Sequence, residues 1–163
     1  MMRFLIAVFA LCALAGATHA QPLADPLAPA RDGMVACNSP IIESRTCRGM
    51  TEYVFSADGA ITSNATASLQ DTPPIVLHIS QPVSVRDGMV CGPWRASDLD
   101  TATFEIDGAP APAEQTQALR AALREALASR FGDACTTYTQ TGETISLSTV
   151  LNGRPLPNVN TMI

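Results

Sequence analysis

The sequence predicts an α+β fold: an antiparallel sheet of about seven or eight short strands, one long amphipathic helix packed on it, and two disulfides. Three observations support this prediction. Apolar and polar residues alternate in short segments separated by Asp-Gly and Asn-Gly turns, one segment has apolar residues at helical spacing, and four cysteines follow an N-terminal leader. The length of 163 residues is typical of a single domain.

Alternation with a period of two residues defines the predicted strands. Tyr53 and Phe55 share one face of a segment that ends at the Asp58-Gly59 turn, and further Asp-Gly and Asn-Gly pairs mark later hairpins. Short strands joined by tight turns are typical of antiparallel sheets. The predicted strands lie at residues 52–56, 60–69, 75–80, 83–86, 102–107, 136–140, 145–151 and 158–163.

Apolar residues at every fourth position predict one helix. They are Leu119, Leu123, Leu127 and Phe131. Prolines before this stripe and Gly132 just after it are typical of the start and the end of a helix. Because the stripe must be buried and the sheet offers the one large surface for it, we expect the helix to pack on the sheet.

The first 20 residues have the three parts of a secretory signal peptide. Arg3 gives a positive start, residues 4–15 are an uncharged apolar run, and small residues follow. We expect cleavage after Ala20, with Ala17 as the alternative. The apolar run is too short to span a bilayer. We therefore expect a periplasmic or secreted protein whose mature chain has no transmembrane segment.

The chain is predicted to have three regions. Residues 1–20 form the signal peptide, residues 21–32 form a Pro/Ala-rich flexible arm, and residues 33–163 form a single α+β domain. The net charge is −5, and removal of Arg3 with the leader makes it one unit more negative. All ten basic residues are arginines, which excludes lysine-dependent chemistry. An acidic chain also argues against nucleic acid as a partner.

Four cysteines remain after the leader, and an even number in an exported chain predicts two disulfides. Three pairings are possible. We expect Cys37–Cys47, which closes a short loop, and Cys91–Cys135, which ties the sheet to the end of the helix. No pair has the CxxC spacing of a zinc site, and one histidine cannot complete the usual Cys/His ligand sets.

Two residues are weak candidates for a functional site. His78 is the one histidine after the leader, and in a hydrolase it would be the general base. The sequence has no GxSxG motif, and the spacing of Ser80 rarely gives nucleophile–base geometry, so we expect no catalytic site. Trp94 is the candidate ligand-binding residue, because its large apolar ring carries a polar N–H group.

Metal and cofactor sites are not expected. The acidic stretch at residues 98–107 lacks the alternating oxygen ligands and the central glycine of a calcium loop. The methionines are too dispersed to indicate a copper site. The sequence thus predicts an exported, non-catalytic domain that binds a small apolar ligand or a protein partner of the cell envelope. A small periplasmic hydrolase using His78 and a structural envelope-associated protein are the alternatives.

Overall fold

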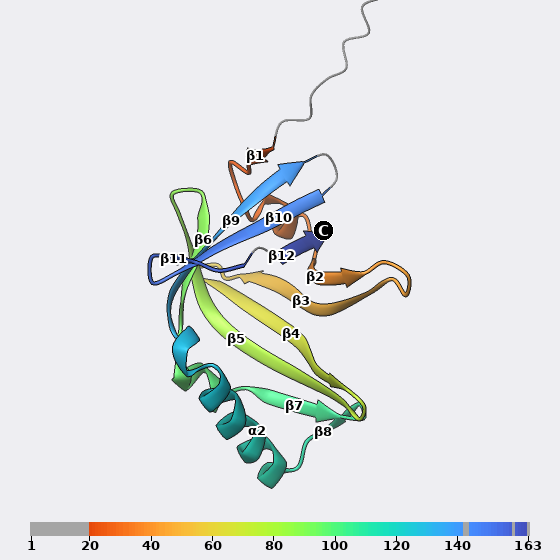
Figure 1. Cartoon of the computed structure of the whole chain (residues 1–163). Helices are drawn as coiled ribbons and strands as arrows, with labels where there is room; N and C mark the ends of the chain where they lie inside the picture. Colours follow the sequence, from red (N-terminus) through yellow and green to blue (C-terminus); the bar gives the residue numbers. More distant parts are fainter. Residues whose placement is uncertain (1–19, 142–143, 158, 163) are drawn as a thin grey trace, which may run out of the picture.

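The fold is a predominantly antiparallel sheet rather than the predicted α+β arrangement. The computed structural model describes residues 20–141, 144–157 and 159–162 (Figure 1). Twelve strands in this part of the chain belong to one sheet, against two α-helices and two 3-10 turns. The signal peptide predicted at residues 1–20 lies, except for Ala20, outside the described residues.

The elements are bounded as follows. The strands are β1 (Gln21–Pro22), β2 (Ala36–Ile41), β3 (Thr46–Phe55), β4 (Ile61–Asp71), β5 (Pro74–Arg86), β6 (Met89–Trp94), β7 (Thr103–Ile106), β8 (Ala109–Pro110), β9 (Gly132–Thr141), β10 (Thr144–Leu151), β11 (Arg154–Pro155) and β12 (Val159–Met162). The helical elements are α1 (Ala28–Arg31), the 3-10 turns η1 (Ala96–Asp100) and η2 (Ala128–Arg130), and α2 (Ala113–Ala126).

The central strands are longer than the sequence predicts. β3, β4 and β5 contain 10, 11 and 13 residues. The strands predicted at 75–80 and 83–86 are one strand, β5, which continues through Pro82 in register with Thr62 of β4. Pro82 lies between the stretch of β5 that pairs with β7 and the stretch that pairs with β6. A proline is tolerated at such a place, where one strand edge has no partner.

Eight of the strands form a closed ring. Antiparallel pairings lead from β2 through β3, β4, β5, β6, β9 and β10 to β12, and β12 pairs with β2 again. In Figure 1, β3 to β5 and β9 to β10 spread apart from a narrow end near β6. Because alternate side chains of a strand face opposite sides, each ring strand sends every second residue inward. The ring therefore encloses an interior of its own.

The prediction of a long amphipathic helix packed on the sheet is wrong. α2 has 14 residues, none of them buried, and it ends before Leu127. It lies beside η1 and β7 (Figure 1). Two of its arginines make polar contacts there. The Arg120 guanidinium donates to the Ala102 carbonyl at 2.7 Å, and Arg124 pairs with Asp100. The partly buried Leu119 and Leu123 of the helix pack against one cluster, which contains Leu99 and residues of β5 and β7. The helix therefore covers one end of the sheet and not its whole face.

The segment expected to be a flexible arm lies against the ring. β1 pairs with β9, and α1 follows. The Leu27 side chain is 1% exposed and belongs to a buried cluster with Val90 and Tyr138. Arg31 pairs with the Asp25 carboxylate at 3.3 Å, and its guanidinium lies 4.5 Å from the centre of the Phe55 ring. Residues 21–31 therefore close one end of the ring.

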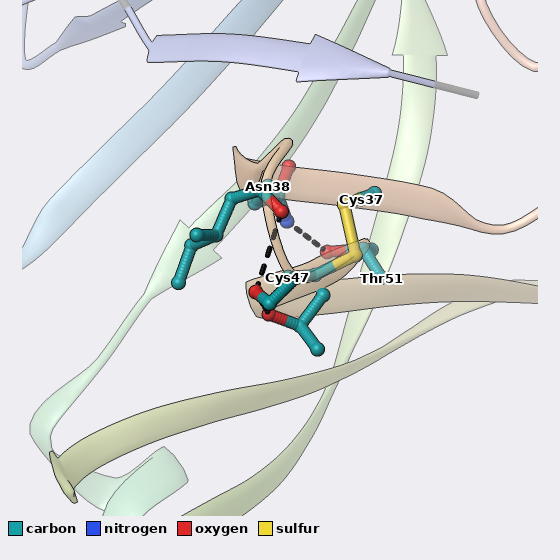
Figure 2. Close-up of a disulfide and its surroundings, with 7 residues drawn as sticks. Cys37, Asn38, Cys47 and Thr51 are labelled. Carbon is teal, nitrogen blue, oxygen red and sulfur yellow. Dashed lines mark hydrogen bonds between the residues drawn. A yellow bond between two sulfur atoms is a disulfide. The ribbon is translucent and has the colours of Figure 1, made fainter.

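The two predicted disulfides are present. Cys37 of β2 is bonded to Cys47 of β3, and Figure 2 shows this bridge beside the Asn38 side chain, which donates a 2.9 Å hydrogen bond to Thr51. Cys91 of β6 is bonded to Cys135, the residue directly opposite it on β9. The second bridge spans 44 residues of sequence and locks the β6–β9 pairing, which is needed to close the ring.

Candidate functional site

The interior of the ring contains a cavity of about 320 Å³. Its wall comes from six ring strands, β3, β4, β5, β6, β9 and β10, together with residues that follow α2 and β11. A volume of this size lies at the small end of the range typical of ligand pockets. The cavity is lined by Tyr53, Ser63, Gln81, Val83, Val90, Gly92, Trp94, Leu127, Arg130, Ala134, Thr136, Tyr138, Leu151 and Leu156.

Gly92 lets β6 approach β5 closely at the cavity wall. A Cβ atom at this position would lie 2.9 Å from the Pro82 carbonyl oxygen and 3.0 Å from a methyl group of Val83. Such distances are well below ordinary van der Waals contact, so a side chain would push the two strands apart. Glycine at this position therefore keeps the wall narrow beside Trp94.

Trp94, the predicted ligand-binding residue, lines the cavity. Its ring is stacked on Phe131 with the ring centres 6.4 Å apart and the planes at 28°. Phe131 is fixed by Asn152, whose amide donates to the Phe131 carbonyl and accepts from the Asp133 N–H. Residues 131–133 are thus hydrogen-bonded to Asn152, directly after β10. Because Phe131 is fixed in this way, the Trp94 ring that stacks on it has a defined orientation in the cavity wall.

The two ends of the cavity differ in exposure. Val90 and Tyr138 are 6% and 5% exposed and lie toward the end that residues 21–31 close. Arg130, which follows α2 in η2, is exposed to solvent. Arg130 and its neighbour Leu127 therefore mark the open end of the cavity.

The two tyrosines of the chain meet at the buried end. The hydroxyl groups of Tyr53 and Tyr138 share a 2.7 Å hydrogen bond between strands 85 residues apart in sequence. Both rings border the cavity on one side and a small gap beneath Pro26 and Pro29 on the other. Burial raises the pKa of both phenols above the ordinary value, since the interior disfavours the phenolate.

These raised pKa values predict a loss of stability at high pH. The folded protein keeps both phenolic protons at a pH where the unfolded chain has lost them, so the free energy of unfolding is unaffected below about pH 10 and falls above it. The fall is at most about 1.4 kcal/mol per pH unit for each of Tyr53 and Tyr138. In an alkaline titration, tyrosinate absorbance should rise only together with the loss of the near-ultraviolet dichroism of Trp94. Ionisation of both tyrosines near pH 10 in the folded protein would contradict this arrangement.

Gln81 places a polar acceptor in a wall that mixes polar and apolar side chains. Its Oε1 atom is buried and has no hydrogen-bond partner in the part of the chain that the structure describes. Two other sets of polar groups in the wall are paired: Thr136 bonds to Thr149 at 2.9 Å, and the tyrosines bond to each other. A buried acceptor without a partner is unfavourable, so the Gln81 carbonyl is available to a donor inside the cavity.

His78 lies away from the cavity. It is on β5, where its neighbours Leu77 and Ile79 face the buried core and its own ring faces the other side of the sheet. Its Nδ1 atom lies 3.3 Å from the Thr66 hydroxyl, and its Nε2 atom lies 3.4 Å from the Glu105 carboxylate. These are cross-strand contacts on a half-exposed sheet surface.

The serine nearest to His78 in sequence is engaged elsewhere. The Ser80 hydroxyl donates to the Asn64 side chain at 2.7 Å. His78 lines neither the interior cavity nor the groove beside Cys37–Cys47. The structure therefore does not bring Ser80 and His78 together as a nucleophile and its base.

The acidic stretch at residues 98–107 is used for structure. The Asp98 carboxylate accepts from the Arg95 N–H at 2.7 Å and caps η1, and Asp100 pairs with Arg124 of α2. Among the described residues, no group of three histidine, cysteine or acidic side chains is placed to hold a metal ion.

A second hollow lies on the surface beside the Cys37–Cys47 disulfide. It has a volume of about 350 Å³ and is bordered by Val35, Ile42 and Arg45 of the β2–β3 hairpin. Ile42 is 64% exposed and Val35 is 43% exposed. This groove is lined by residues 35–47 and shares no residue with the wall of the ring cavity.

Comparison of the chain with protein-family models, with curated proteins and with solved structures finds no match. The two disulfides fit a protein of an extracellular or other oxidising compartment. Within the described residues, no helix is both long and apolar enough to cross a membrane.

Sequence reasoning found one residue of the cavity and missed the others. Trp94 stood out because the chain has a single tryptophan. The pairing of Tyr53 with Tyr138 could not be seen, because it depends on the register of strands that are not neighbours in sequence. A weak signal existed: each tyrosine sits in an alternating segment, and the chain contains no others.

Proposed function

We propose that the protein is an exported, non-catalytic binding domain that takes a small, largely apolar ligand into the cavity inside its strand ring. The observation that carries this proposal is the cavity of about 320 Å³, whose wall combines aromatic and aliphatic side chains with a few polar ones. The polar ones besides the two tyrosines are Ser63, Gln81, Thr136 and Arg130. Preformed hollows lined by aromatic and aliphatic groups with few polar atoms are typical of small-molecule sites. Burial of apolar ligand surface there supplies the binding free energy.

Export to the periplasm, with cleavage after Ala20, is part of this proposal. Cleavage at that bond leaves Gln21 as the first residue, and Gln21 is also the first residue of β1, opposite Gln140 of β9. Both disulfides hold strands of the ring, so an oxidising compartment favours the form that contains the cavity. Ligand binding and export are thus supported by the same strand pairings.

The experiment uses the single tryptophan as a built-in probe. Protein secreted with its own leader is purified from the periplasm, and a mass beginning at Gln21 is expected. The Trp94 emission is then followed during titration with 1-octanol, a neutral apolar probe. We expect a saturable change, because Trp94 is part of the cavity wall.

The matched variants separate the cavity from the outer surface. Ala134→Phe fills the cavity and should weaken octanol binding by about tenfold or more, since each 1.4 kcal/mol of lost contact is a factor of ten. The smaller Ala134→Leu replacement gives the same test with less risk of overpacking. His78→Ala, on the outer face, should bind octanol like the natural protein. No saturable signal, or equal binding by the filled variants, would contradict the proposal.

A further inference from the structure

Arg130 is the charged residue at the open end of the cavity. Of the fourteen lining residues in the described chain, it alone carries a formal charge at neutral pH. No carboxylate in this part of the chain lies within ion-pair distance of its guanidinium. Arg120 and Arg124, on the neighbouring helix α2, are by contrast bound to a backbone carbonyl and to Asp100. Within the described residues, a cation without a carboxylate partner therefore stands beside the cavity of an acidic protein.

The size of the cavity limits the ligand. A volume of about 320 Å³ holds about ten water-sized groups at about 30 Å³ each. A straight or branched molecule of about ten non-hydrogen atoms therefore fits inside. Its body meets Val83, Val90 and Leu151 in the wall, while its end at the mouth reaches the guanidinium of Arg130.

Resting on the proposed function, we infer that the ligand is a small amphipathic carboxylate, with an apolar body of medium length inside the ring and its carboxylate bound by Arg130. A guanidinium presents two parallel N–H donors that match the two oxygens of a carboxylate. One cation balances one carboxylate. A phosphate monoester, with nearly two negative charges, would be left partly unbalanced on a chain of net charge −5.

The test compares three probes of equal chain length by Trp94 emission: octanoate, 1-octanol and octylammonium. We expect the natural protein to bind octanoate about tenfold more tightly than octanol, as expected for a charge-assisted hydrogen bond at a partly exposed site. Octylammonium should bind more weakly than octanol, because its charge faces Arg130. Added salt should weaken octanoate binding and leave octanol binding unchanged.

The decisive variant is Arg130→Gln, with Arg48→Gln as the control for loss of one positive charge. Arg130 is exposed, so its replacement is compatible with folding. Arg48 lies on β3 and does not line the cavity. We expect Arg130→Gln to abolish the preference for octanoate over octanol, and Arg48→Gln to keep that preference.

The outcomes separate this inference from the proposed function. Equal affinity for octanoate and octanol in the natural protein, or a preference that survives Arg130→Gln, would overturn the carboxylate assignment and leave the apolar cavity as the binding site. A failure of all three probes to give saturable binding would overturn the proposed function itself.

Discussion

Replacement of Leu27 by alanine should lower the free energy of unfolding by about 2–5 kcal/mol, the range measured for large-to-small changes in well-packed cores. Leu27 is 1% exposed, although it lies in a segment rich in proline and alanine. Its side chain packs with Val90, Tyr138 and Ile145 at the closed end of the ring. Loss of the isopropyl end of the side chain would leave a cavity where neighbouring strands have little freedom to collapse.

Urea denaturation at neutral pH measures this effect, with Leu69→Ala as the matched control. Leu69 is 39% exposed near the end of β4, so its truncation should change stability by at most about 0.5 kcal/mol. If Leu27→Ala unfolded at the same urea concentration as the natural protein, residues 21–31 would be a dispensable arm. The structure predicts that they belong to the fold, and the packing of Arg31 on Phe55 adds to this expectation.

Removal of the Cys91–Cys135 bridge should destabilise the protein by about 4 kcal/mol, against about 2.7 kcal/mol for Cys37–Cys47, if loop-closure entropy dominates. The difference follows from the sequence separations of 44 and 10 residues. The longer bridge also joins β6 to β9, the pairing that links the two sides of the ring.

Two paired variants make this comparison, Cys91→Ala with Cys135→Ala and Cys37→Ala with Cys47→Ala. Both are measured by urea denaturation beside the oxidised natural protein. The first variant should also lose the octanol-dependent change in Trp94 emission at lower urea than the second, because Trp94 lies on the strand that the bridge fixes. Greater destabilisation by loss of the short bridge would contradict the view that β6–β9 pairing holds the ring closed.

Sequence reasoning succeeded where structure is local. Alternation of apolar and polar residues located strands such as residues 52–56 and 136–140. It does so because successive side chains of a strand face opposite sides of the sheet, and one side is buried. It failed for the helix, because Leu127 and Phe131 continue the four-residue spacing without continuing the helix. The structure uses these two residues after the helix, at the cavity mouth and beneath Trp94.

The cavity could not be predicted because it depends on ring closure. Closure requires β6 to pair with both β5 and β9, and β12 to pair with β2, over long separations in sequence. The two-residue alternation shows which residues of one strand share a face of the sheet. It does not show which strands pair with each other. The proline-rich segment at residues 21–31 is a further case, because its two leucines, Leu23 and Leu27, stand among prolines and alanines and give no extended periodic pattern.

The most direct test of the account is to map octanoate binding by NMR on the ¹⁵N-labelled, disulfide-bonded protein. We predict that the NMR signals of the Trp94 indole and of the amides of Val83, Val90 and Ala134 shift together and saturate, since these residues line one cavity. The amide of Ile42, beside the surface groove, should not move. Shifts confined to that groove or to the outer face of the sheet, with an unchanged Trp94 indole, would contradict the claim that the ring interior is the binding site.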